Sequence, residues 1–158
     1  MGEYVATSED LSTYCGLYCG ACGVKNGRIR DTATALKQLL DMYAYPEWAP
    51  MMAEWFPETK HYPEFDAVLK WVATQDCPGC RGGGGNPECA IRICAKGRGY
   101  VGCWECAEID RDCETLREIA GGYPELMDNL RQIALDGLQA WEQEQAARVR
   151  AGFSYVKQ

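Results

Sequence analysis

The chain has 158 residues, 47% of them apolar, and a formal net charge of −7. This length fits one domain with enough apolar side chains for a core. The negative charge makes phosphate backbones unfavourable partners, so nucleic-acid binding is not expected. No apolar run approaches the roughly 18 residues that a membrane helix needs, so we expect no membrane partner.

Residues 1–10 contain neither the basic stretch nor the apolar stretch of a secretory signal. The expected location is therefore the cytoplasm. Disulfides do not persist there, and clustered cysteines in such proteins usually serve metal or redox chemistry. Ten cysteines in a chain of this size thus become the main clue to function.

Three cysteine-free stretches place apolar side chains at the spacing of an amphipathic helix. They are residues 32–44, with Asp31 and Thr32 as candidate N-caps, residues 63–74, and residues 124–150. The last stretch is the longest, and one stripe along it consists of Leu126, Leu130, Ile133, Gly137, Trp141 and Val149. The five tryptophans are expected to be the heavy packing units of the core: Trp48, Trp55, Trp71, Trp104 and Trp141.

A Tyr-Pro-Glu-apolar sequence occurs at residues 45–48, 62–65 and 123–126. Its irregular spacing argues against an internal repeat. The pattern instead predicts helix starts, with proline in the first turn and glutamate facing the positive end of the helix dipole. At the first copy Pro50 interferes, and the helix there is expected to begin at Pro50 and end near Phe56.

The cysteines form two groups along the chain. The N-terminal group has the spacing C-x3-C-x2-C, and the second group contains two C-x-x-C units, at 77/80 and 103/106. A two-residue spacer lets both sulfurs reach one tetrahedral ion from a tight turn. We predict metal ligands at all ten positions, although one or two thiols could be simple core residues. The candidate ligands are Cys15, Cys19, Cys22, Cys77, Cys80, Cys89, Cys94, Cys103, Cys106 and Cys113.

The spacing leaves the division of these ligands open. Ten thiols make two tetrahedral sites with two left over. A local division would join the thiols of residues 77–94 at one ion, and Cys103, Cys106 and Cys113 at another with one N-terminal thiol. An interleaved division would combine the two C-x-x-C units, as in a zinc ribbon. The C-x3-C-x2-C spacing is also that of radical-enzyme clusters, but the barrel of such enzymes takes roughly 200 residues or more.

Zinc is the favoured metal, because closed all-thiolate sites with C-x-x-C pairs are typical of it. A [4Fe–4S] cluster is the alternative, since four thiolates hold that cluster as well.

Arg92, Lys96 and Arg98 are expected to offset the negative charge of the thiolates rather than to bind an anion. His61 is expected at the surface or at a helix cap. Residues 82–85, four glycines, predict a flexible loop and not a P-loop, because the Gly-Lys-Ser/Thr ending is missing.

Residues 14–22, Tyr-Cys-Gly-Leu-Tyr-Cys-Gly-Ala-Cys, resemble the opening signature of the domain-of-unknown-function 3795 family. The resemblance continues at residues 77–80, 89–97 and 103–106, and it covers about residues 13–116. It departs at Cys113, which here follows Arg-Asp where members often have an aromatic residue and proline. The resemblance implies a cysteine-rich, metal-binding fold and implies no reaction.

We therefore predict a single, mainly α-helical domain over residues 1–158, with little β-structure beyond short hairpins near the cysteines. Residues 13–24 and 76–116 should form a zinc-type module, and residues 30–75 and 123–150 the helical parts.

The predicted function is metal binding, with structural zinc at about two sites in an interaction or scaffold module for a protein partner. An iron–sulfur electron-transfer protein is one alternative. A metalloenzyme that uses a leftover reactive cysteine is another, although a non-enzymatic role is favoured because no acid/base couple stands out.

Overall fold

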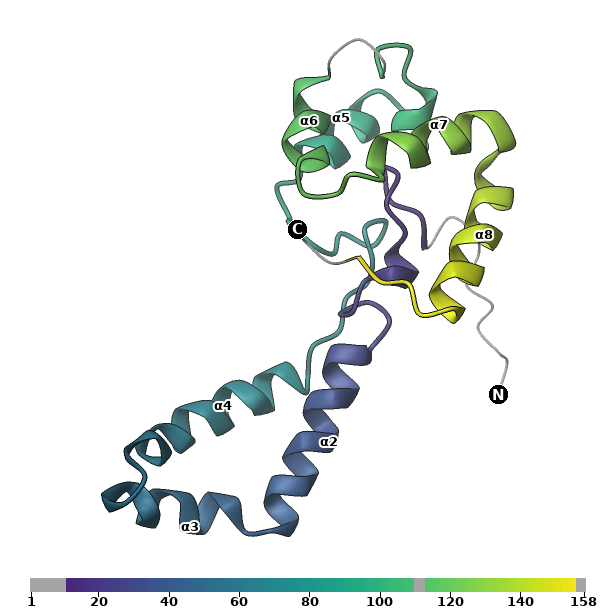
Figure 1. Ribbon diagram of the computed structural model, residues 1–158. Coiled ribbons are helices and arrows are strands. Elements are labelled where there is room, and N and C mark those ends of the chain that lie inside the picture. The colour runs from purple at the N-terminus through teal and green to yellow at the C-terminus, as the bar shows by residue number, and fades with distance from the viewer. Residues whose placement is uncertain (1–10, 110–112, 156–158) are drawn as a thin grey trace. The chain divides into compact units, whose positions relative to one another are not determined.

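The computed structural model describes residues 11–109 and 113–155. The chain divides into two compact units (Figure 1). The helical unit comprises residues 27–76, and the cysteine unit comprises the described residues of 1–26 and 77–158. Seven α-helices, α2 to α8, account for most of the described residues, which confirms the mainly α prediction.

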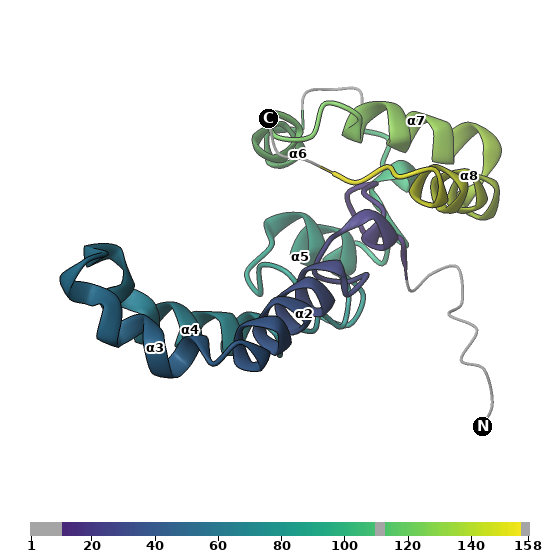
Figure 2. The ribbon, with the colours of Figure 1, turned by 60° about the horizontal axis from the view of Figure 1, so that its bottom comes forward.

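The helical unit contains α2 (Arg28–Met42), α3 (Tyr45–Met51) and α4 (Tyr62–Val72). Two short 3-10 helices, η2 (Met52–Glu54) and η3 (Pro57–His61), connect α3 to α4. Figure 2 shows α3 following α2 and leading back to α4, and both α2 and α3 pack against α4.

Helix α2 begins earlier than the predicted caps. Gly27, with φ +78°, is the N-cap residue, so Asp31 lies in the first turn and Thr32 inside the helix. A left-handed glycine starts the helix here without a capping side chain. The carboxylate of Asp31 still lies near the positive end of the helix dipole, where it is favourable.

The second Tyr-Pro-Glu sequence starts a helix as predicted, and the first also starts one, although the helix there was expected to begin later. Pro46 and Pro63 lie in the first turns of α3 and α4. The predicted helix from Pro50 is wrong, because α3 already begins at Tyr45 and Pro50 lies near its end. A proline at this position removes one backbone hydrogen bond from the last turn of the helix, where the helix ends anyway. At the third sequence the helix begins only at Leu126, two residues after the proline.

The cysteine unit contains α5 (Ala90–Gly97), α6 (Glu114–Ala120), α7 (Leu126–Asp136) and α8 (Leu138–Arg150). The predicted single helix over residues 124–150 is therefore wrong. Gly137 has φ +85° and ψ 155°, a conformation that a side chain disfavours, and it breaks the stretch into α7 and α8. Apolar spacing continues across the glycine, so periodicity alone did not indicate the break.

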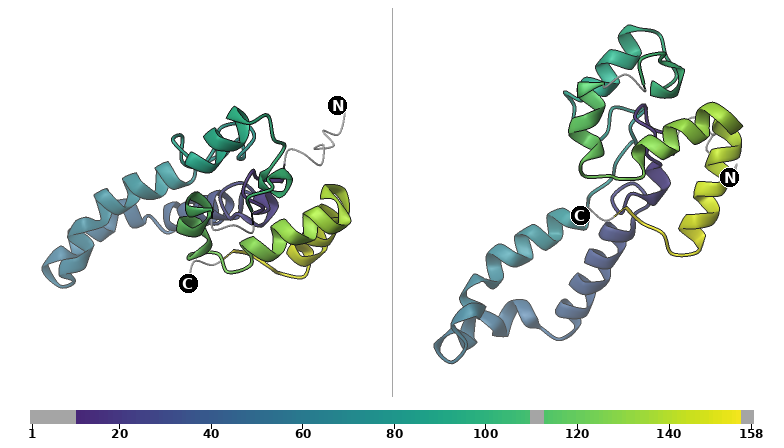
Figure 3. Two further views of the ribbon diagram at one scale, coloured as in Figure 1. Left: turned by 90° about the horizontal axis from the view of Figure 1, so that it is seen from above. Right: turned by 45° about the horizontal axis from the view of Figure 1, so that its top comes forward.

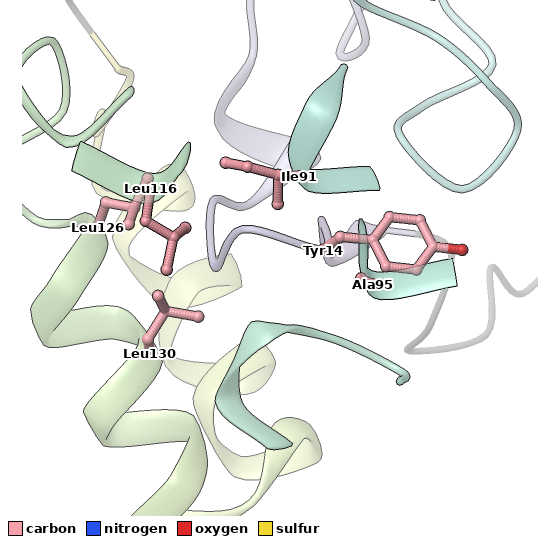
Figure 4. Packing of buried hydrophobic residues seen from close by; sticks show 6 residues of the cluster. All are labelled: Tyr14, Ile91, Ala95, Leu116, Leu126 and Leu130. Atoms are coloured by element: carbon pink, nitrogen blue, oxygen red, sulfur yellow. The ribbon is translucent and has the colours of Figure 1, made fainter. Parts of the chain in front are cut away.

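Two apolar clusters form the core of the cysteine unit. Ile91 and Ala95 of α5 belong to the first cluster together with Leu116, Leu126 and Leu130 (Figure 4). The second cluster centres on Trp141, which is 1% exposed. The segment of residues 11–22 runs between α5 and the α7–α8 pair (Figure 3). It contributes one tyrosine to each cluster, Tyr14 to the first and Tyr18 to the second.

The tryptophans do not all serve the core. Trp141 is buried, as expected, and its ring meets that of Tyr18 edge to face with centroids 5.9 Å apart. Trp55 and Trp71, in contrast, are 65% and 62% exposed on the helical unit. The unit has only three helices and 50 residues, so it has little interior for large side chains.

Regular β-structure is absent from residues 11–109 and 113–155. A single bridge between Ser12 and Tyr18 stands where short hairpins were predicted. Within the same described residues, none of the helices combines the length and the apolar character that crossing a membrane requires.

Candidate metal centres

The first cysteine segment is fixed by side chains from the far end of the chain. Asn129 on α7 donates an amide hydrogen bond to the carbonyl of Gly16 at 3.0 Å. The backbone N–H of Tyr18 donates to the hydroxyl of Tyr155 at 3.1 Å. Both hydrogen bonds are made by backbone groups that lie between Cys15 and Cys19 in the sequence. The position of these thiols therefore depends on tertiary structure.

Gly16 makes the turn between these two cysteines possible. Its φ is +85°, and a Cβ at this position would lie 2.7 Å from Cδ2 of Leu130. Both the backbone conformation and the close approach of α7 therefore require glycine. The turn is closed by the N–H of Leu17, which donates to the hydroxyl of Thr13 at 2.8 Å.

The second segment is the C-x-x-C turn of Cys77 and Cys80, over which the glycine loop folds back. Gly79 has φ +83°, as a tight turn at this point requires. The N–H of Gly84 donates to the carbonyl of Gly79 at 2.8 Å. A Cβ on Gly84 would lie 2.5 Å from Sγ of Cys77, so the loop passes directly against this thiol.

Arg92 shapes the same loop. The residue is 7% exposed and sits on α5, and its guanidinium faces the loop. Its donors bind the carbonyl oxygens of Cys80, Gly84, Asn86 and Pro87 at 3.4, 2.8, 2.6 and 3.1 Å. Arg92 was expected to offset the negative charge of the thiolates. Its hydrogen bonds go to carbonyl groups instead, so its main role is to hold the loop.

Arg81, which directly follows the C-x-x-C turn, ties it to the first segment. Its guanidinium donates to the carbonyl of Ser12 at 3.2 Å and to the hydroxyl of Ser12 at 3.1 Å. The same group lies 4.1 Å from the ring centroid of Tyr14. Sequence reasoning missed Arg81, whose only signal is its position next to Cys80.

Six of the ten cysteines line one cavity of about 360 Å³, which we name the six-thiol pocket. The N–H of Cys80 points to Sγ of Cys19 at 3.5 Å, which joins the first segment to the second. The hydroxyl of Thr13 lies 3.1 Å from Sγ of Cys15. The six thiols are those of Cys15, Cys19, Cys22, Cys77, Cys80 and Cys89.

The other four cysteines, Cys94, Cys103, Cys106 and Cys113, line a smaller cavity of about 50 Å³, the four-thiol pocket. Nη1 of Arg98 lies 3.9 Å from Sγ of Cys106 and 3.3 Å from a carboxylate oxygen of Glu108. This placement agrees with the predicted role of Arg98 in offsetting thiolate charge.

The two pockets contain the same local turn. In the 3-10 helix η4 (Cys103–Glu105), the N–H of Cys106 donates to the carbonyl of Cys103 at 3.0 Å. In η1 (Cys19–Ala21), the N–H of Cys22 donates to the carbonyl of Cys19, also at 3.0 Å. Residues 19–22 thus form a third C-x-x-C unit. Sequence reasoning had read them only as part of the C-x3-C-x2-C pattern.

The pockets divide the cysteines differently from both expected divisions. Cys94 joins the 103/106 unit, and all three N-terminal thiols join the 77/80 unit. Helix α5 explains the separation of Cys89 from Cys94. Cys89 is its N-cap residue, and five helical residues turn by about 500° and rise by about 7.5 Å. The two thiols therefore leave the helix on different faces and at different heights.

Burial keeps several of these thiols neutral in the absence of a cation. It raises the pKa of Cys103 to about 12 and that of Cys19 to about 11, and neighbouring thiols add to both shifts. Burial also raises the pKa of Cys15. Because desolvation disfavours the thiolate, a cation bound among the sulfurs would have to supply the missing stabilisation.

In the side-chain placement of residues 11–109 and 113–155, no three or more His, Cys, Asp or Glu groups have the arrangement of a metal site. The ligand roles of the ten cysteines therefore stay predictions. The position of a cysteine sulfur is set by a single side-chain torsion, χ1. His61 is exposed at the end of η3 in the helical unit, as its expected surface position requires.

The comparisons with known proteins agree with the resemblance noted from the cysteine motifs. The chain matches none of the curated proteins and none of the solved structures with which it was compared. A family model described as protein of unknown function (DUF3795) matches residues 11–118. This range is more than half of the chain and includes all ten cysteines, so the protein belongs to the DUF3795 family.

Proposed function

We propose that this protein binds zinc through cysteine thiolates at two centres, one in each thiol pocket, and that these ions hold the cysteine unit in shape. One observation carries the proposal. Ten cysteines spread over residues 15–113 gather in two pockets, with none of them outside. Hydrophobic packing alone does not require thiols to gather in this way, whereas tetrahedral coordination does.

The four-thiol pocket supports a closed structural site. Four thiols equal the four ligands of a tetrahedral zinc ion. A cavity of about 50 Å³ suits a single ion better than a [4Fe–4S] cluster, which occupies more space. The cation of Arg98 near Sγ of Cys106 reduces the negative charge that four thiolates leave on such a centre.

Metal content is the direct test. The chain should be purified without oxygen and under reducing conditions, and zinc, iron and sulfide should be measured on the same sample as the visible spectrum. A colourless protein with at least two zinc ions per chain is the expected result. Iron with matching sulfide would instead favour an electron-transfer protein, and a chain without metal would contradict the proposal.

A pair of variants links the ions to the pockets. Cys103→Ser with Cys106→Ser removes one C-x-x-C unit from the four-thiol pocket, and it should lower the zinc content by one ion. Ser154→Ala is a matched control, because this hydroxyl binds the carbonyl of Ala21 at 3.0 Å without contributing a thiol. An unchanged zinc content in the cysteine variant would show that the four-thiol pocket binds no ion.

Protein binding by the helical unit is a second candidate function. Most of the large apolar side chains exposed within the described residues belong to this unit, Trp55 and Trp71 among them. Such a concentration is typical of interaction surfaces. The purified chain and a variant with Trp55→Gln and Trp71→Gln should be compared as bait. A protein held by the first and lost by the second would support this function, and equal retention would contradict it.

A further inference from the structure

We propose that the helical unit pairs with a second copy of this chain through one apolar face, which α2 and α4 form together. The inference deepens the second candidate function, protein binding by the helical unit, because it names the partner and the surface. It does not depend on metal in the thiol pockets. The face consists of Ile29, Leu36 and Leu39 of α2, Tyr43 directly after α2, and Phe65, Val68 and Val72 of α4.

Buried residues mark the side on which α2 and α4 meet, and the two helices run in opposite directions (Figure 1). On α4 the buried residues are Tyr62, Asp66 and Leu69, and on α2 Ala33 is buried. Lys37 lies one turn after Ala33, and its ammonium group is 3.6 Å from the carboxylate of Asp66. These residues therefore form the contact between the helices.

An apolar stripe lies beside the buried residues on each helix. On α2, Ile29 comes four residues before Ala33 and Leu36 comes three after it, and on α4 Phe65 comes four before Leu69. With 3.6 residues per turn, both steps rotate to the same flank of the buried residue. Two antiparallel helices that face each other are related by a half-turn, so equal flanks lie on the same side of the pair. The two stripes thus combine into one face.

The opposite side of the helix pair is charged. Lys37 pairs with Asp41, and Lys70 pairs with Asp66 at 2.6 Å. Asp41 and Lys70 come four residues after Lys37 and Asp66, a step that rotates away from the apolar stripes on both helices. The contact between Lys37 and Asp66 joins these two ion pairs across the helices. The helix pair therefore has one charged side and one apolar side.

The apolar face is exposed and is large enough for a stable dimer. Six of its seven side chains are 41–66% exposed. At about 100 Å² for each half-exposed large side chain, the face offers roughly 700 Å². A specific interface buries about 800 Å² on each partner. Trp71, 62% exposed and three residues after Val68 on α4, supplies further area at the edge of the face.

The chemistry of the face favours a second copy over other partners. Its seven side chains are all uncharged, so two copies can meet there without repulsion between like charges. Two helices laid on two others form a four-helix bundle, which covers both apolar stripes at once. A single foreign helix would cover the seam between α2 and α4 and leave much of the stripes exposed. An anionic membrane suits the unit poorly, because residues 27–76 contain eight acidic and five basic side chains, a net charge of −3.

Sedimentation equilibrium of the full-length chain tests the inference. The chain is used as purified, under reducing conditions, so that no disulfide links two copies. Between about 1 and about 100 μM, the range in which interfaces of this kind associate, the mass should rise from that of one chain towards that of two. This measurement needs no variant, so it does not depend on the folding of any mutant.

A matched pair of variants locates the interface. Leu39→Glu places a charge in the apolar face and should raise the dissociation constant of the dimer at least about tenfold. Val68→Glu should do the same from α4. Gln38→Glu adds the same charge to the neighbouring exposed residue on the other flank of α2 and should leave the dimer unchanged. Circular dichroism checks that each variant keeps its helices, and the milder Leu39→Gln replaces a charged variant that does not.

The outcomes separate the inference from the proposed functions. A chain that stays monomeric throughout would overturn the dimer, whereas another protein retained by this surface would still support the second candidate function. A dimer that Leu39→Glu and Val68→Glu leave intact would place the interface elsewhere and overturn the inference as well. Zinc content is measured independently, so neither result decides whether the thiol pockets bind metal.

Discussion

The helical unit and the cysteine unit achieve order by different means. The helical unit has no cysteine, and its three helices follow one another along a single stretch of chain. Its buried side chains are few: Ala33, Ala49, Tyr62, Asp66 and Leu69. The cysteine unit brings together segments far apart in sequence through two apolar clusters and two thiol pockets. The comparison indicates that packing between helices that follow one another in sequence suffices for one unit, whereas the other depends on contacts between distant segments and, as we propose, on metal.

Metal removal should give the largest effect and should separate the two units. Structural zinc contributes about 10–16 kcal/mol of apparent binding free energy in small peptides, so its loss should unfold the cysteine unit. Chelation under reducing conditions, followed by hydrogen exchange and mass spectrometry, should show rapid exchange in residues 77–109. Protection in residues 27–76 should change far less. Equal loss of protection in both ranges would mean that the units are not independent.

Leu130 should show the next largest effect, because it lies at the centre of the first apolar cluster. It is 0% exposed, and its side chain packs against Gly16 in the first cysteine segment. Leu130→Ala should lower the free energy of unfolding of the metal-loaded chain by about 2–5 kcal/mol, since it leaves a cavity.

The control for this substitution lies on the same helix. Leu135→Ala removes a side chain that is 79% exposed, so it should change stability by less than about 0.5 kcal/mol. Urea unfolding followed by circular dichroism gives both values. A small loss from Leu130→Ala would mean that metal binding, and not apolar packing, carries the stability of this region.

In both units the sequence predicted the presence of helices better than their ends, and in the helical unit the helix expected from Pro50 instead begins at Tyr45. In the helical unit, α4 begins one residue before the predicted start and ends two residues before the predicted end, because Pro63 marks its first turn. In the cysteine unit, the stretch of residues 124–150 was predicted as one helix although Gly137 divides it. Apolar spacing and proline positions thus located the helices. They did not indicate whether a glycine such as Gly137 lies inside a helix or ends it.

The thiol pockets were less predictable for a physical reason. The ten candidate residues were evident from spacing, but the grouping depends on the turn of α5 between Cys89 and Cys94. The supporting contacts of Asn129 and Arg81 join residues far apart in sequence. No local pattern encodes such partners, because they arise only when the segments meet.

Acid should reveal a smaller difference, located in the helical unit. The carboxylate of Asp66 accepts a hydrogen bond from Lys70 at 2.6 Å and has Lys37 at 3.6 Å. These cations, Lys70 first, lower the pKa of Asp66 below its ordinary value of 3.8. A lowered folded-state pKa contributes stability that is present above the ordinary value and is lost as the pH falls through the folded-state value.

Asp66→Asn should therefore destabilise the chain at neutral pH and have a diminishing effect as the pH falls below about 4. Urea midpoints of variant and wild type should be compared at each pH, so that any acid-induced loss of metal affects both proteins equally. Lys70→Met should act in the same direction, since it removes the main donor. A difference that stays constant across this pH range would show that the ion pair does not cause it.

Trp71 should give the smallest effect, and it tests whether the apolar surface of the helical unit is free. The side chain is 62% exposed, whereas that of Trp141 in the cysteine unit is 1% exposed. Trp71→Gln should change the free energy of unfolding by no more than about 0.5 kcal/mol, and Trp141→Ala should cost about 3–5 kcal/mol. If Trp71→Gln proved as costly as a core substitution in dilute solution, this side chain would be buried there, and a surface available to partners would have to be sought elsewhere on the protein.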